Sequence, residues 1–165
     1  MIFGLSTYGF VHTALSLLAL VSGLMVVMGL LAARRLDALT ALYLASAVAA
    51  NVTGFGFSAS FGIPHYIGSA ALVVLPVAIL ARYAFRLAGP WRWIYAIATV
   101  LTVHSLAFFT IGEAFRRIPA LNAMAPTLTE LPFTLAQLGA AALFVALAIA
   151  AAMNFHPEVA AEAQR

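Results

Sequence analysis

Five long apolar runs dominate this chain and restrict its fold more than any other feature. A helix needs about 20 apolar residues to cross the hydrocarbon layer of a membrane, and each run reaches this length. The short breaks between most of the runs predict antiparallel neighbours. We therefore expect an all-α integral membrane bundle of five transmembrane helices, followed by a short cytoplasmic tail over residues 154–165. The five expected helices cover residues 8–32, 38–61, 64–86, 91–114 and 133–153.

The composition agrees with a lipid environment. Hydrophobic residues make up 65% of the chain and charged residues only 8%, whereas an ordinary soluble domain is about 25% charged. The pI of about 9.8 would suit nucleic acid, but the sequence has no lysine and no basic face, so we expect no nucleic-acid partner. The absence of cysteine excludes disulfides, thiolate metal sites and thiol catalysis. The sequence contains no phosphate-binding loop and no Ser/His/Asp arrangement, so no motif indicates an enzyme of the soluble type.

The arginines predict how the bundle is oriented. Cytoplasmic loops of membrane proteins carry an excess of arginine and lysine. More arginines flank the first and third breaks than the fourth, so we expect the first group to be cytoplasmic, with the N-terminus outside and the C-terminus inside. The larger group is Arg34, Arg35, Arg82, Arg86 and Arg92, and the smaller group is Arg116 and Arg117.

The connection from about Phe115 to Pro132 is the longest, and it is the one real loop that we expect. Thr127 and Glu130 have the spacing of a capping box, in which the two side chains satisfy free amides at the start of a helix. The fifth helix is therefore expected to begin near residue 128, before Pro132.

Small residues recur at every fourth position of the second expected helix. Such a stripe lets a neighbouring helix approach closely within a membrane, so we predict a packing role. Asn51 and Thr53 lie beside the stripe and need partners, because lipid offers none. Hydrogen bonds to other helices are the favoured interpretation, and a ligand contact is the alternative. The stripe consists of Ser46, Ala50, Gly54, Ser58 and Gly62.

Three histidines are the candidate binding residues. His12 and His65 lie near the start of two helices that both run from outside to inside, so both are expected near the outer surface. His104 lies in the middle of its helix, where an ionisable group is costly and usually faces the protein interior. A neutral imidazole suits a structural hydrogen bond, a haem or metal ligand, or a proton-transfer group, and the sequence leaves these roles open.

Two cofactors are compatible with these histidines. His12 and His65, if opposed across the bundle, would ligate a b-type haem, although their spacing is not specific to haem. A metal site would combine them with an acidic residue, and the acidic candidates near the outer surface are Glu113 and Glu130. Each glutamate also has a simpler role, since Glu130 belongs to the capping box and Glu113 precedes two arginines by one helical turn.

Seven segments spread over nearly the whole chain carry a further indication. They are His12-Thr-Ala-Leu-Ser-Leu, Arg34-Arg35-Leu-Asp-Ala-Leu-Thr-Ala-Leu-Tyr, Thr53-Gly-Phe, Ile63-Pro-His65-Tyr-Ile-Gly, Ala81-Arg-Tyr, Trp91-Arg-Trp-Ile-Tyr and Pro119-Ala-Leu-Asn-Ala-Met-Ala-Pro126-Thr. Together they resemble a group of small uncharacterised inner-membrane proteins of proteobacteria. The resemblance implies a location in the bacterial inner membrane. It includes the positions of His12 and His65 but not that of His104, and it carries no known activity.

Three functions of different classes remain open. The leading hypothesis is a non-enzymatic bundle whose outer half binds a small apolar ligand, a lipid, a quinone or haem, in a pocket lined by His12 and His65 with His104 as a further candidate. The second is a membrane oxidoreductase with haem b between His12 and His65 that exchanges electrons with quinone. The third is a structural subunit of a homo-oligomer or larger membrane complex, packed through the small-residue stripe.

Overall fold

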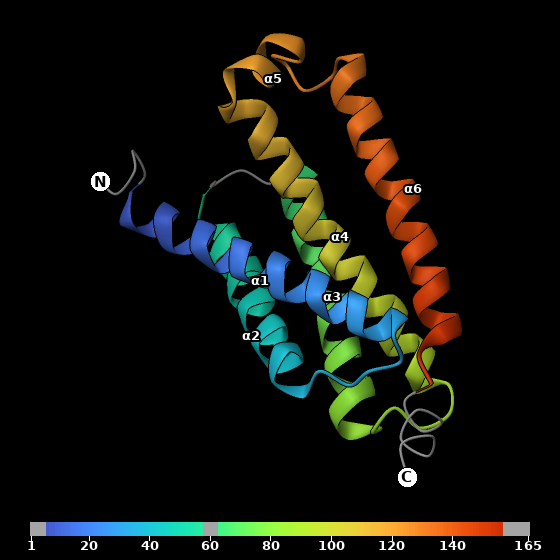
Figure 1. The fold of residues 1–165 in the computed structure, drawn as a ribbon. Coiled ribbons are helices and arrows are strands. Elements are labelled where there is room, and N and C mark those ends of the chain that lie inside the picture. Colours follow the sequence, from blue (N-terminus) through green and yellow to red (C-terminus); the bar gives the residue numbers. More distant parts are fainter. Residues whose placement is uncertain (1–5, 58–62, 157–165) are drawn as a thin grey trace.

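The computed structural model describes residues 6–57 and 63–156, which form helices and no strand (Figure 1). Five of the helices are long and apolar enough to cross a membrane. This confirms the expected all-α membrane bundle, and the chain is a multi-pass helical membrane protein. A sixth helix, α5 (Pro119–Met124), is short and lies within the long connection predicted from about Phe115 to Pro132. The long helices are α1 (Thr7–Leu31), α2 (Asp37–Gly54), α3 (Ile63–Ile79), α4 (Trp91–Arg117) and α6 (Leu131–Asn154).

Three of the long helices end differently from the prediction. α2 passes into a 3₁₀ turn, η1 (Phe55–Phe57), while residues 58–62 lie outside the described chain. α3 passes into a π-helix, η2 (Leu80–Ala84). α4 continues past its predicted end to Arg117, and the carboxylate of Glu113 forms stabilising ion pairs with both arginines of the last turn.

The start of α6 corrects the sequence prediction. α6 begins at Leu131, with Pro132 in its first turn, and not near residue 128. Thr127 and Glu130 do bond to each other, since the Glu130 carboxylate accepts hydrogen bonds from the Thr127 amide and hydroxyl. These bonds close a turn that precedes the helix. The φ of Leu128 is +59°, a left-handed conformation that a right-handed helix does not contain.

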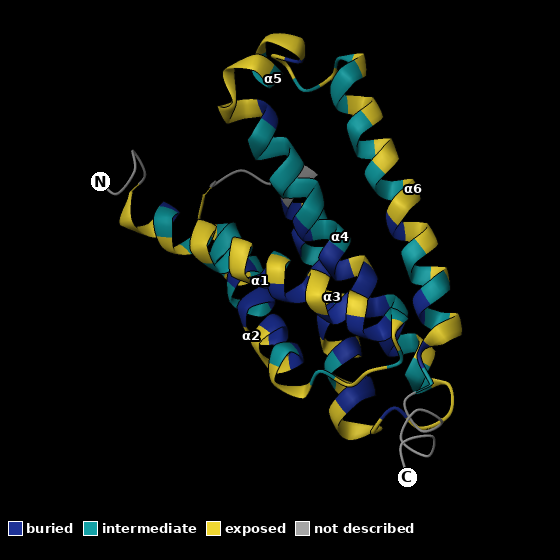
Figure 2. Ribbon diagram, viewed as in Figure 1, coloured by how far each residue is buried: buried dark blue, intermediate teal, exposed yellow. Residues whose placement is uncertain are grey.

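The bundle packs closely where α1 crosses α2 and α4. A Cβ at Gly23 would lie 2.7 Å from Val103 Cγ2 and 2.9 Å from the Tyr43 ring, so the three helices meet there without space for a side chain. Tyr43 is fully buried, and its hydroxyl bonds to the Thr102 hydroxyl and, at 3.4 Å, to the Thr99 carbonyl. Buried residues gather around this crossing, whereas the halves of α4 and α6 next to α5 are mostly half-buried or exposed (Figure 2). The core therefore lies away from α5.

The small-residue stripe of α2 is partly visible as a packing surface. Ser46 and Ala50 are buried, and a Cβ at Gly54 would lie 3.5 Å from His12 Cε1 of α1. The stripe therefore meets α1 at Gly54. The two remaining predicted members, which fall outside the described residues, are Ser58 and Gly62.

Arg82, which the sequence suggested only as an orientation signal, connects two helices at the end of the bundle opposite α5. Its side chain is 6% exposed and forms an ion pair with Asp37 at the start of α2. Its guanidinium also lies 5.3 Å from the ring centroid of Tyr95 on α4, within the range of a cation–π interaction.

Candidate ligand site between α4 and α6

His12 is held by hydrogen bonds near the start of α1. Its Nδ1 lies 2.9 Å from the Thr53 hydroxyl of α2, and its Nε2 lies 3.5 Å from the Ser16 hydroxyl. The Thr53 hydroxyl donates its own proton to the Ala49 carbonyl at 2.7 Å, so it accepts from His12, and the imidazole proton is on Nδ1. The His12 ring also packs against Phe57, with 4.8 Å between ring centroids. His12 thus joins α1 to α2, which confirms the interhelical bond predicted for Thr53.

Asn51, the other polar residue beside the stripe, uses its amide within its own helix. The Asn51 side-chain nitrogen donates to the Ala47 carbonyl at 2.8 Å. Its Oδ1 faces α3, because it would lie 3.9 Å from a Cβ at Gly68. Among the described residues, the hydrogen bond of the Asn51 side chain therefore runs along α2, whereas the sequence favoured a bond to another helix.

His65, at the start of α3, packs against a different ring of η1. It is 9% exposed, and its ring lies 5.6 Å from that of Phe55, whereas His12 packs against Phe57. Within the described residues, no group of three or more His, Cys, Asp or Glu side chains is placed to hold a metal ion. The metal site predicted from His12, His65 and a glutamate is therefore not formed there, while haem binding by the two histidines stays a prediction.

The two acidic candidates have partners of their own. The carboxylate oxygens of Glu113 lie 2.9 Å from Arg116 Nη1 and 2.8 Å from Arg117 Nε, which confirms the simpler role predicted for Glu113. The carboxylate of Glu130 accepts hydrogen bonds from the Thr127 amide and hydroxyl in the turn before α6. These glutamates therefore stabilise the chain around α5.

His104 lies in the middle of α4 and faces α6. Its ring is 5.1 Å from the ring of Phe144, and its Nε2 is buried with no hydrogen-bond partner in the described chain. His104 lines a cavity of about 330 Å³ between α4 and α6, to which His12 and His65 do not contribute. The structure thus separates the three histidines that the leading hypothesis placed around one pocket.

Gln137 of α6 is the second polar residue of this cavity, and it was not among the residues predicted for a site. Its Nε2 donates to the Phe108 carbonyl of α4 at 3.1 Å, while its Oε1 is buried and has no partner among the described residues. The sequence did contain a signal, because Gln137 is the only side-chain amide in the apolar run 133–153, where lipid provides no hydrogen bonds.

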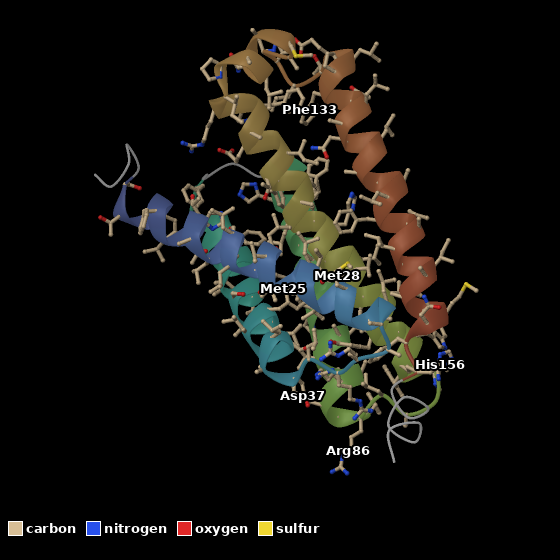
Figure 3. All side chains as sticks on the ribbon, in the orientation of Figure 1. Met25, Met28, Asp37, Arg86, Phe133 and His156 are labelled. Atoms are coloured by element: carbon tan, nitrogen blue, oxygen red, sulfur yellow. The ribbon has the colours of Figure 1, made fainter. Side chains whose placement is uncertain are left out.

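The rest of the cavity wall is apolar apart from Thr134. Phe133 points from the start of α6 toward α4 (Figure 3). Leu138 is 60% exposed, so the cavity opens toward the surroundings of α6, which in a membrane are lipid. The other lining residues are Phe108, Leu128 and Ala141.

The sparse burial of α6 explains why a cavity forms here. Within α6 only Phe144 and Ala151 are buried, and both follow the cavity along the helix. α6 is therefore packed on the bundle in the half away from α5, and space remains between α4 and α6 in the other half.

A turn held by Glu130 contributes Leu128 to the cavity lining. Leu128 lines the cavity with a left-handed backbone conformation that bulky residues rarely adopt. The residues on both sides of it are fixed, since the Glu130 carboxylate accepts from the Thr127 hydroxyl at 2.7 Å and from the Thr129 amide at 3.1 Å. The hydrogen bond from Thr127 and those from the backbone amides hold the pKa of Glu130 below its ordinary value of 4.5.

Acidification is expected to loosen this turn. Because the pKa of Glu130 is lowered by folding, its contribution to stability is complete above pH 4.5 and is lost as the pH falls through the lowered pKa. The amide NMR shifts of Thr127 and Thr129 should therefore titrate with a midpoint below 4.5. Thr127→Val removes the hydroxyl donor and should move the midpoint upward, whereas an unchanged midpoint in this variant would contradict the assignment.

Fold and site together define a multi-pass α-helical membrane protein with a lipid-facing apolar cavity, lined in part by two residues that each have a buried polar atom without a partner among the described residues. Comparison of the chain with known protein families, with curated proteins and with solved structures finds no match.

Proposed function

We propose that this protein binds a small apolar ligand, which enters the cavity between α4 and α6 from the lipid. One observation carries the proposal: His104 Nε2 and Gln137 Oε1 are both buried without a partner in the described chain, and both residues line the same cavity. Leaving a buried polar group unpaired costs about 1–3 kcal/mol. A ligand that pairs with these atoms recovers this free energy on binding.

The size and lining of the cavity support the same proposal. Ligand pockets typically have volumes of about 300–1,000 Å³ and apolar walls with a few polar groups that orient the ligand. The cavity has about 330 Å³, and the polar side chains among its described lining residues are those of His104, Thr134 and Gln137. The exposed Leu138 at its edge supports entry from the membrane rather than from water.

The proposal places the cavity in the outer half of a bacterial inner membrane. The excess of arginine at the end opposite α5 supports a cytoplasmic position for that end, and the resemblance described above supports the bacterial inner membrane. The chain has no cysteine, so single-cysteine variants give a direct test. Met124→Cys in α5 should react with an impermeant maleimide in spheroplasts, whose inner membrane is intact. Ala38→Cys should react only after lysis.

Photolabelling with an alkyl-phenyl diazirine, an apolar carbene source, tests the ligand site. In bilayer nanodiscs, the label should concentrate on the residues of α4 and α6 that line the cavity. Ala141→Phe fills the cavity and should remove most of this label, whereas Ala142→Phe, at an exposed neighbouring position, should leave it. Uniform labelling of all lipid-exposed residues, unchanged by Ala141→Phe, would overturn the proposal.

The other hypotheses stay predictions. No contact within the described residues favours haem binding by His12 and His65, quinone-linked electron transfer or a subunit role over ligand binding. A Soret band in protein purified from its native membrane would establish haem.

A further inference from the structure

The orientation of the Gln137 amide restricts which ligand the cavity accepts. The Phe108 carbonyl can only accept a hydrogen bond, so the Gln137 atom 3.1 Å from it must be the nitrogen. The other end of the amide, Oε1, is therefore the buried atom of this cavity-lining residue that has no partner in the described chain. A carboxamide oxygen can only accept, and so its partner on the ligand must be a donor. Ethers, esters and ketones do not provide one.

The lining of the cavity also excludes a charged head group. None of its described lining residues carries a formal charge when His104 is neutral. The nearest arginines along α4, Arg116 and Arg117, are paired with Glu113. The hydroxyl proton of Thr134 is already donated to the Glu130 carbonyl at 3.2 Å. An ammonium or carboxylate head would lose its hydration without an opposite charge to replace it.

His104 provides the second restriction. His104 lines the same cavity, and its Nε2 is buried without a partner among the described residues. His104 precedes Phe108, the residue bonded to Gln137, by one helical turn. In the Nε2–H tautomer this nitrogen donates and needs an acceptor. One hydroxyl meets both demands, because its proton goes to Gln137 Oε1 while its oxygen accepts from His104 Nε2.

The walls indicate an aromatic body behind this hydroxyl. Phe108 and Phe133 line the cavity, and the ring of Phe144 lies 5.1 Å from that of His104. Aromatic rings pack favourably against one another in edge-to-face or offset geometry. Resting on the proposed function, we infer that the ligand is a neutral phenol whose hydroxyl donates to Gln137 and accepts from His104.

Three probes that share one apolar body test this inference: 4-octylphenol, its methyl ether and octylbenzene. Each probe competes with the diazirine label for the protein in nanodiscs. Because the probes also partition into the bilayer, this partition is measured in empty discs, and the probe concentrations are corrected for it. The phenol should displace the label at about a tenfold lower concentration than the ether, the usual effect of one well-formed hydrogen bond to a buried group. Octylbenzene should be no better than the ether.

Two variants assign the effect to the proposed atoms. Gln137→Leu removes the acceptor and should make phenol and ether equal, while the Phe108 carbonyl keeps its bond within the helix. His104→Phe preserves an aromatic wall but removes the donor, so it should weaken displacement by the phenol and by the ether alike and leave octylbenzene unchanged. The unfolding midpoint of each variant in detergent serves as the control for folding.

The outcomes separate the inference from the proposal beneath it. If all three probes displace the label equally and Ala141→Phe abolishes this displacement, the proposed ligand site stands and the inference that the ligand is a phenol is overturned. Displacement by none of them, together with labelling insensitive to Ala141→Phe, would overturn both. A preference for phenol that survives Gln137→Leu would overturn the role of Gln137 and with it the inference.

Discussion

Gly23→Ala is expected to lower the free energy of unfolding by about 1–3 kcal/mol, the usual cost of overpacking a filled core. The new Cβ would lie 2.7 Å from Val103 Cγ2 and 2.9 Å from the Tyr43 ring. Neither neighbour moves easily. Val103 is buried and β-branched, with a stiff χ1, while the Tyr43 ring is anchored through its hydroxyl to Thr102 of α4. Relief of the overlap would therefore require separation of the helices.

Gly139→Ala is the matched control. A Cβ at Gly139 of α6 meets no atom within 4 Å among the described residues. Alanine is better than glycine in a helix interior by about 1 kcal/mol, so this variant should be neutral or slightly stabilising. Unfolding by SDS, followed by the fluorescence of Trp91 and Trp93, compares both variants with wild type. Equal midpoints for Gly23→Ala and wild type would contradict the tight crossing.

The helices of this protein were predictable because the membrane imposes their length. A chain that crosses about 30 Å of hydrocarbon must satisfy its backbone internally, so each crossing is an uninterrupted apolar run. Which face of each helix packs against protein and which faces lipid was not predictable, because both surroundings are apolar. Leu75 is fully buried and Leu138 is 60% exposed, yet lipid and protein core select equally for leucine. Hydrophobic periodicity therefore does not distinguish the two faces.

The site was predictable only in part. His104 stood out because an ionisable group in mid-membrane is costly. Its cavity depends on how α6 diverges from α4, which no local pattern records. The capping-box spacing of Thr127 and Glu130 predicted the right hydrogen bonds and the wrong helix start, because the same bonds also close a turn when Leu128 takes a left-handed conformation. The sequence therefore predicted the hydrogen bonds between Thr127 and Glu130, but it did not predict the backbone conformation of Leu128 between them.

Arg82 illustrates a further limit of the sequence. Forty-five positions separate it from its partner Asp37, and an arginine close to the end of a membrane helix is normally interpreted as a signal of orientation. In the structure the two residues have unequal surroundings. The side chain of Asp37 is 81% exposed, while that of Arg82 is 6% exposed. Loss of one partner should therefore not be equivalent to loss of the other.

Asp37→Ala is accordingly expected to destabilise the protein more than Arg82→Met. Without Asp37, the buried guanidinium loses its counter-ion, and we expect a loss of about 2 kcal/mol, less than for a fully buried pair because water reaches the Asp37 side. Arg82→Met leaves a carboxylate in water and keeps an apolar stem. Its cost, about 1 kcal/mol, is the interaction with the Tyr95 ring.

The double variant separates the ion pair from other effects of Asp37, such as its favourable position in the first turn of α2. If Asp37 acts mainly on the Arg82 charge, Asp37→Ala should cost much less in the Arg82→Met background than in wild type, because no buried charge is left unpaired. SDS unfolding of the four proteins measures this difference. Additive costs would show that water replaces Asp37 fully, and that Arg82 is stabilised by Tyr95 and its surroundings alone.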